Sequence, residues 1–122
     1  MSRILYIEDD LFVNRLVKKM LKPLGYDIID AETALEGLYL AMDVRPDLIL
    51  MDASLPDMAG AEVIRLLKQS PLAHTPVIVL TDDMSTRQAC LEAGCDVYLN
   101  EPVRANTLQR TIAEFVQSAH SA

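Results

Sequence analysis

Short runs of consecutive apolar residues recur along the chain, and each is too short to form a helix. They comprise Ile4–Ile7, Ile28–Ile29, Leu48–Met51, Val77–Leu80 and Val97–Leu99. Runs of this length, rich in β-branched and large apolar side chains without polar residues at alternate positions, are typical of strands buried on both faces. The pattern therefore predicts five short strands in the interior of a sheet.

Segments with a helical period separate these strands. Apolar side chains recur at intervals of three and four residues within 13–24, 35–42, 63–67, 89–93 and 108–119. The first four segments end at or near residues that terminate helices, namely Gly25, Pro46, Pro71 and Gly94. Strands that alternate with helices in this way predict an α/β fold, in which crossover helices cover both faces of a doubly wound parallel sheet.

Length and charge narrow the functional classes. The chain has 122 residues, which suits one domain over residues 1–122, and we expect a frayed tail at 118–122. Eleven Lys and Arg against eighteen Asp and Glu give a net charge of −7, which argues against nucleic acid as the main partner. Because no apolar run approaches the ~18 residues needed to span a bilayer and no signal peptide is apparent, we expect a cytoplasmic protein without membrane association.

Acidic residues and one hydroxyl follow the predicted strands. Glu8-Asp9-Asp10 follow the first strand, Asp52 the third, Thr81-Asp82-Asp83 the fourth and Asn100-Glu101 the fifth. Because the carboxyl ends of parallel strands meet at one edge of a sheet, we expect a cluster of carboxylates there. Clustered carboxylates repel one another, and a bound Mg²⁺ ion, which prefers oxygen ligands, removes that penalty. The sequence therefore predicts a magnesium site at this edge.

The same cluster suits phosphoryl chemistry. A carboxylate such as Asp52, beside a bound metal ion, can act as a nucleophile on phosphorus and form an acyl phosphate, and Thr81 could then hydrogen-bond the added group. Helix capping is the simpler reading for Asp10, and for Asp83 or Ser85 before the fourth helix. It does not account for Asp52, which is followed by Ala-Ser-Leu-Pro rather than by a helical pattern.

Four motifs, in their order and spacing, resemble the response regulator receiver domain of two-component signalling. They are Ile4–Asp10, Pro46–Asp52 with Leu55–Gly60, Pro76–Thr81, and Ala93–Leu99 with Pro102. The resemblance covers essentially the whole chain. It implies a flavodoxin-like (βα)5 fold with strand order 2-1-3-4-5, and Mg²⁺ as the cofactor.

The resemblance also implies roles for individual residues. Asp52 is the expected phosphoacceptor and a metal ligand, Asp9 the direct Mg²⁺ ligand, and Glu8 a ligand acting mainly through water. Ser54 is expected to offer its backbone carbonyl to the metal. Thr81 resembles the switch hydroxyl of the family.

One further residue, the aromatic Tyr98, matches the family, and two residues, Glu101 and Asp82, differ from it. Tyr98 resembles the aromatic residue that moves inward when the switch hydroxyl engages the phosphoryl group. The family has a lysine immediately before the last motif proline, whereas this chain has Glu101. Ionised Glu cannot donate the hydrogen bond that lysine makes to a phosphoryl oxygen. Asp82 adds a charge where the family commonly has a small residue. The direction of the Glu101 side chain, into the site or out to solvent, stays open at this point.

Two functions follow from the resemblance. The first is a single-domain response regulator, not a turnover enzyme, that accepts phosphate from a histidine kinase or phosphotransfer protein. It would signal to a protein target through the face formed by helix 4, strand 5 and helix 5, as a monomer or weak dimer. The resemblance places the phosphodonor at the first helix, near Asn14, Arg15 and Lys18, although a solvated helix face accounts equally well for these polar residues. The alternative is a degenerate receiver that binds a partner independently of phosphorylation, which Glu101 and Asp82 favour.

Overall fold

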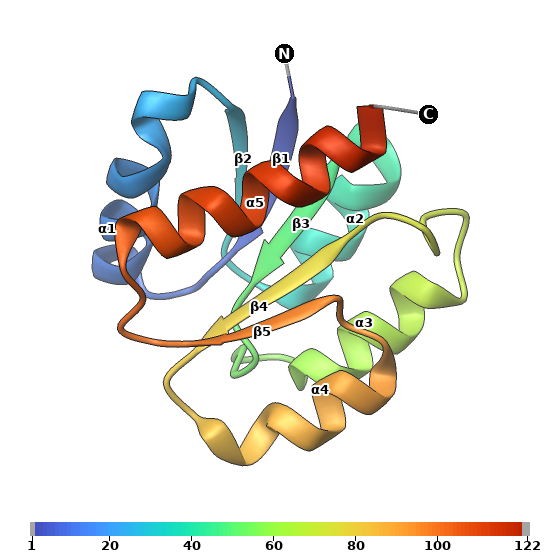
Figure 1. Cartoon of the computed structure of the whole chain (residues 1–122). Coiled ribbons are helices and arrows are strands. Elements are labelled where there is room, and N and C mark those ends of the chain that lie inside the picture. Colours follow the sequence, from blue (N-terminus) through green and yellow to red (C-terminus); the bar gives the residue numbers. More distant parts are fainter. Residues whose placement is uncertain (1, 121–122) are drawn as a thin grey trace.

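A parallel sheet of five strands runs through the molecule in the order β2-β1-β3-β4-β5 (Figure 1). The computed structural model describes residues 2–120, and the side chains of residues 2–116. The strands are β1 (Arg3–Ile7), β2 (Asp27–Ala31), β3 (Leu48–Met51), β4 (Val77–Thr81) and β5 (Val97–Asn100). The predicted strands, their order and the flavodoxin-like α/β fold are confirmed.

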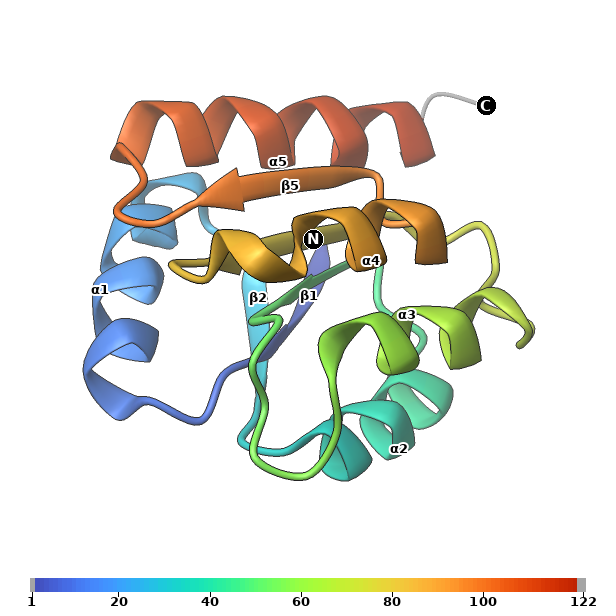
Figure 2. The same cartoon turned by 90° about the horizontal axis from the view of Figure 1, so that it is seen from below.

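Helices cover both faces of the sheet (Figure 2). They are α1 (Leu11–Leu21), α2 (Ala34–Val44), α3 (Gly60–Lys68), α4 (Arg87–Ala93) and α5 (Ala105–His120), with short 3-10 turns η1 (Lys22–Leu24) and η2 (Met84–Thr86). Side chains of α1 and α5 form one apolar core with the sheet, and side chains of α2, α3 and α4 form the other. No helix among residues 2–120 is long and apolar enough to cross a membrane.

The central strands explain the continuous apolar runs. Successive side chains of a strand point to opposite faces, so Ile4 and Tyr6 of β1 join the α1–α5 core, whereas Leu5 and Ile7 join the other core. All of them are at most 1% exposed. The register pairs Ile7 with Met51 of β3, which brings the residues that follow these two strands to the same edge of the sheet.

Capping side chains fix where two helical segments begin. The Asp10 carboxylate accepts hydrogen bonds from the backbone N–H groups of Phe12 and Val13, at 2.9 and 3.2 Å, and so caps α1 as predicted. Asp83 accepts one from the Ser85 N–H at 3.0 Å and caps η2, the short turn that precedes α4. The expected frayed tail at 118–122 falls on residues whose side chains, or whose whole placement, lie outside the described part of the chain, and it stays a prediction.

Candidate functional site

Three carboxylates converge at the carboxyl edge of the sheet. Glu8, Asp52 and Glu101 each place a carboxylate oxygen within 4.8 Å of the others. Glu8 follows β1 and Asp52 follows its neighbour β3, so their closeness results from strand pairing. Glu101 follows β5, and its backbone N–H donates to the Thr81 carbonyl oxygen at 2.8 Å, which anchors it beside the end of β4. The open question about Glu101 is therefore answered, because its side chain points into the site.

An acidic cavity of about 210 Å³ opens above these groups. Its lining residues are Glu8, Asp9, Asp10, Val13, Asp52, Asp82 and Glu101, and no Lys or Arg is among them. Glu8 is only 3% exposed and forms the floor, whereas Asp52 and Glu101 are half-buried. The cavity thus collects negative charge without a neighbouring cation in its lining.

Burial and mutual repulsion shift the carboxyl groups toward their neutral forms. Burial, followed by the charges of Asp52 and Glu101, raises the pKa of Glu8 from 4.5 to about 8, against the opposing Asp10 N–H. The pKa of Asp52 is raised by burial, although the Ser54 N–H and the Thr81 hydroxyl act in the opposite direction. Burial and the charges of Asp52 and Asp82 raise the pKa of Glu101. A cation entering this cluster would therefore release a proton from Glu8 at neutral pH.

The other two predicted metal ligands, Asp9 and Ser54, and the atypical site residue Asp82 lie around this group. Asp9 and Asp82 are exposed and line the cavity, but neither belongs to the three mutually close carboxylates. The exposed Ser54 donates its backbone N–H to the Asp52 carboxylate at 3.3 Å. The structure therefore brings Glu8 and Asp52 together as expected, and of the two directions left open for Glu101 it shows the one into the site.

The two predicted switch residues, Thr81 at the end of β4 and Tyr98 in β5, both contact the loop that connects β4 to α4. Thr81 is fully buried, and its hydroxyl oxygen accepts a hydrogen bond from the Asp83 N–H at 3.1 Å. Tyr98 is half-buried, and its hydroxyl donates to the Asp83 carbonyl oxygen at 2.7 Å. The same hydroxyl lies 2.8 Å from the Thr86 hydroxyl. Tyr98 is thus tied to the loop that follows Thr81 rather than to Thr81 itself.

Two residues near the site were missed by the sequence reasoning. The Tyr6 hydroxyl is buried and has no hydrogen-bond partner among the described residues. Asp57, in the connection between β3 and α3, accepts hydrogen bonds from the backbone N–H groups of Ala34 and Leu35 at 2.8 and 3.0 Å. It therefore caps α2 from the loop that carries Ser54. The Asp57 cap leaves no local signal, because its partners lie in a distant segment of the chain, and the burial of the Tyr6 hydroxyl depends on tertiary packing.

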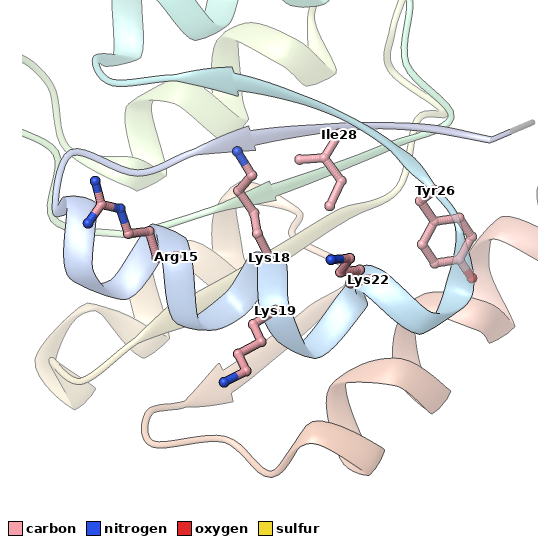
Figure 3. A pocket seen from close by; sticks show the side chains of 6 residues that line it. All are labelled: Arg15, Lys18, Lys19, Lys22, Tyr26 and Ile28. Atoms are coloured by element: carbon pink, nitrogen blue, oxygen red, sulfur yellow. The ribbon is translucent and has the colours of Figure 1, made fainter.

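A second, basic cavity of about 610 Å³ lies between α1 and β2 (Figure 3). Its lining residues are Arg15, Lys18, Lys19, Lys22, Tyr26 and Ile28. Figure 3 shows that Lys18 and Lys19 extend in opposite directions from the helix. Lys18 forms an ion pair with Asp30 at 2.7 Å, and Asn14, which is only 9% exposed, donates its side-chain amide to the same Asp30 at 2.8 Å. Asn14 and Lys18, two of the residues near which we expect the phosphodonor, thus share Asp30 of β2 as a partner, and docking at this helix stays a prediction.

Comparison with known proteins now decides the family. The family model of the response regulator receiver domain matches residues 4–113, which is most of the chain. This chain belongs to the response regulator receiver family. The receiver is 34% identical over 123 residues to the polar-differentiation response regulator DivK of Brucella anthropi, covering 95% of this chain and 97% of that relative.

Solved structures agree with the receiver fold. The receiver domain of a signal transduction histidine kinase from Syntrophus aciditrophicus matches with a TM-score of 0.91 at 28% identity, over 100% of this chain and 95% of that one. The receiver domain of a sensor histidine kinase from Pseudomonas aeruginosa PAO1 matches with a TM-score of 0.88 at 29% identity, over 95% of this chain and 98% of that one. That crystal structure holds a magnesium ion coordinated in its active-site cleft.

Proposed function

We propose that this receiver accepts a phosphoryl group on Asp52 in the presence of Mg²⁺ and passes the signal on through protein contacts. The observation that carries the proposal is the position of Asp52. Its half-buried carboxylate lines the acidic cavity and lies within 4.8 Å of the Glu8 carboxylate. Asp52 is thus accessible to a phosphodonor and adjacent to a second oxygen ligand for a cation.

The chemistry of the donor set fits Mg²⁺. This ion takes oxygen ligands, keeps several waters and is usually held by one or two carboxylates plus phosphate. Glu8, Asp9 and Asp52 would hold it, with the backbone carbonyl of Ser54 as a further donor. When bound, the ion supplies positive charge that offsets the repulsion between the carboxylates and the incoming phosphoryl oxygens.

The residues of the chain would carry out the transfer itself. An oxygen of the Asp52 carboxylate forms a bond to phosphorus while the bond between phosphorus and the donor breaks, and the electron pair leaves with the donor. Thr81 is placed one strand away from Asp52, and its hydroxyl would donate a hydrogen bond to the added phosphoryl group. Since its oxygen holds the Asp83 N–H at 3.1 Å, such a move would also alter the loop to which Tyr98 is tied.

The partners follow from membership of the family. A histidine kinase or a histidine phosphotransfer protein is the proposed phosphodonor in the cytoplasm, and the protein would act as a single-domain response regulator. A downstream protein would recognise the face formed by α4, β5 and α5. The Tyr98–Asp83 contact lies in this region and supports a role for it, because it connects β5 to the loop before α4.

Glu101 favours a second candidate function. A carboxylate occupies the position where the family has a lysine, and it lies inside the cluster. A dianionic phosphoryl group would meet this charge without a charge-assisted hydrogen bond worth ~1.5–3 kcal/mol. Under this alternative, the protein binds a partner independently of phosphorylation.

The test is the mass of the intact protein after incubation with acetyl phosphate and Mg²⁺. The proposal predicts addition of one phosphoryl group to the wild-type protein, none to Asp52→Asn, and loss of the adduct when Mg²⁺ is removed with a chelator. Asp43→Asn, the same change at an exposed position of α2, is the matched control and leaves the adduct in place. An unmodified wild-type protein, or an adduct that persists in Asp52→Asn, would contradict the proposal and favour the alternative.

A further inference from the structure

Glu101 belongs to the carboxylate cluster, in addition to standing where the family has a lysine. Its carboxylate lies within 4.8 Å of those of both Glu8 and Asp52, although the three residues follow three different strands. Its backbone is fixed beside the end of β4 by the hydrogen bond to the Thr81 carbonyl oxygen. Two oxygens that bind one ion at ~2.0–2.6 Å lie at most ~4.0–5.2 Å apart. Small side-chain movements are therefore enough for the three oxygens to converge on a single ion.

Among the side chains that the structure describes, no basic residue lines the acidic cavity around the cluster. The lining of the acidic cavity contains six acidic residues and Val13, and no basic side chain. The ion pairs among the described residues involve Asp27, Asp30, Glu62 and Asp96, and none of them reaches the cluster. Three close carboxylates without a protein counter-charge are costly unless protons or a cation neutralise them.

A second observation points to a ligand at the same place. Tyr6 is 1% exposed, and its hydroxyl has no hydrogen-bond partner among the described residues. Tyr6 lies in β1 two positions before Glu8, which follows the strand, so the two side chains leave the extended backbone on the same side of the sheet. An orphaned buried hydroxyl is unfavourable. Because this hydroxyl is closed to water in the structure, a water carried by a bound Mg²⁺ ion can become its partner only if the side chains that cover it move.

We propose that Glu101 is a third carboxylate ligand for a divalent cation, together with Glu8 and Asp52. The inference rests on the metal site of the proposed function and assigns it a ligand that replaces the lysine of the family. The consequence concerns regulation. A site with three protein carboxylates binds its cation more tightly than a site with two, and it depends less on phosphate to complete the ligand set. Cation binding is then a signal that this receiver reads in its own right.

The experiment measures Mg²⁺ binding by titration calorimetry at constant ionic strength, with the intact chain. Replacement of Glu101 with Gln keeps the size of the side chain and removes its charge, and we expect the Kd for Mg²⁺ to rise at least tenfold. Asp82→Asn is the matched control, because Asp82 lines the same cavity without belonging to the three-carboxylate group. It removes the same charge, and we expect its Kd to change less than threefold.

A second measurement separates binding from folding. Without metal, Glu101→Gln removes repulsion, so its Tm should equal or exceed that of the wild-type protein, whereas the increase in Tm caused by Mg²⁺ should shrink. The inference is overturned if Glu101→Gln binds Mg²⁺ as tightly as the wild-type protein, if it weakens binding no more than Asp82→Asn does, or if the wild-type protein binds no Mg²⁺.

Failure of the inference and failure of the proposed function give different results. Normal phosphorylation of Asp52 combined with an unchanged Mg²⁺ affinity of Glu101→Gln overturns the three-carboxylate site alone. Mg²⁺ binding that depends on Glu101, without any phosphoryl adduct on Asp52, supports the three-carboxylate site and contradicts the phosphoacceptor role. As a further check, Glu101→Lys should lose Mg²⁺ affinity by more than tenfold in the absence of phosphate, since it replaces a ligand with a cation.

Discussion

The Tyr98 hydroxyl donates a hydrogen bond to the Asp83 carbonyl oxygen over 2.7 Å and thereby ties strand β5 to the loop after β4. The Thr86 hydroxyl, 2.8 Å away, completes the contact. The Thr81 hydroxyl oxygen accepts a hydrogen bond from the Asp83 N–H, so the backbone of Asp83 is bound by side chains from the adjacent strands β4 and β5. If either side chain changes its hydrogen-bond partner, the loop around Asp83 therefore loses one of the two hydrogen bonds that fix its position.

Loss of the Tyr98 hydroxyl should loosen this loop. Tyr98→Phe keeps the ring and removes the hydrogen bond, so we expect a decrease of ~1 kcal/mol in the free energy of unfolding. We also expect faster amide hydrogen exchange within residues 82–86. Tyr39→Phe is the control, since Tyr39 on α2 is 71% exposed. Equal exchange rates in the two variants would show that the Tyr98 contact does not order the loop.

The metal-free protein should become less stable as the pH rises. The pKa of Glu8 is 4.5 ordinarily and about 8 in the fold. Between these values the folded state keeps a proton that the unfolded state has lost, so the free energy of unfolding falls with rising pH. Gln does not titrate, so the stability of Glu8→Gln should not fall in this way. At pH 8 the variant should be more stable than the wild-type protein by about 1–3 kcal/mol, allowing for solvent screening near the cavity.

The measurement is thermal or urea unfolding from pH 5 to pH 8 in the presence of a chelator. Addition of Mg²⁺ should reverse the trend for the wild-type protein, because the ion competes with the proton for the same carboxylates. Glu114→Gln on α5, an exposed position outside the site, serves as the control and should keep the wild-type slope. A wild-type stability that rises steadily over this pH range would contradict the raised pKa.

Asp57 should couple the loop after β3 to the start of α2. Its carboxylate accepts hydrogen bonds from the backbone N–H groups of Ala34 and Leu35 at the start of α2, and these two hydrogen bonds lower the pKa of Asp57. A carboxyl group with a lowered pKa stabilises the fold above its ordinary value of 3.8, and the benefit is lost as the pH falls below it. We expect Asp57→Ala to lower the Tm by a few degrees at pH 7 and by less in strong acid.

A variant of the neighbouring cap provides the comparison for Asp57. Thr33 caps the same helix from its own N-cap position, where its hydroxyl oxygen accepts from the Glu36 N–H at 3.1 Å. Thr33→Ala should also lower the Tm, but without a change in the backbone amide signals of Asp52 and Ser54. Asp57→Ala should change those signals. Identical spectra for the two variants around Asp52 would rule out the proposed coupling.

The first residue of α3, Gly60, packs closely against the backbone of Ala53, the residue that follows Asp52. A Cβ atom at Gly60 would lie 2.7 Å from the Ala53 Cα and 3.0 Å from its carbonyl oxygen. Since both atoms belong to the backbone, Gly60→Ala must displace the chain and should cost about 1–3 kcal/mol of stability. At Gly37 the same substitution meets the Ile7 side chain, with its Cγ1 at 2.8 Å, which can change rotamer. Gly37→Ala should therefore be the milder of the two in urea unfolding.

Periodicity predicted the five strands and the helices between them, whereas the strand order came from the resemblance to the receiver family; given that order, the meeting of Glu8 with Asp52 follows from the geometry of parallel sheets. Asp10 was also predictable as a cap, since its role depends on residues only two and three positions away. The inward direction of Glu101 was not predictable, because it depends on a hydrogen bond from the Glu101 backbone N–H to the Thr81 carbonyl oxygen at the end of the neighbouring strand β4. The same holds for Asp57, whose partners lie 23 and 22 positions away.

The basic cavity beside α1 has a consequence for how the molecule moves before it meets a partner. Four cationic side chains line it, whereas the chain as a whole carries a net charge of −7 and gathers carboxylates at the edge of the sheet. Such a separation gives the protein a permanent electric dipole moment, and the field of an approaching charged molecule exerts a torque on it. Rotational alignment then precedes contact, and the association rate should fall as added salt shortens the Debye length.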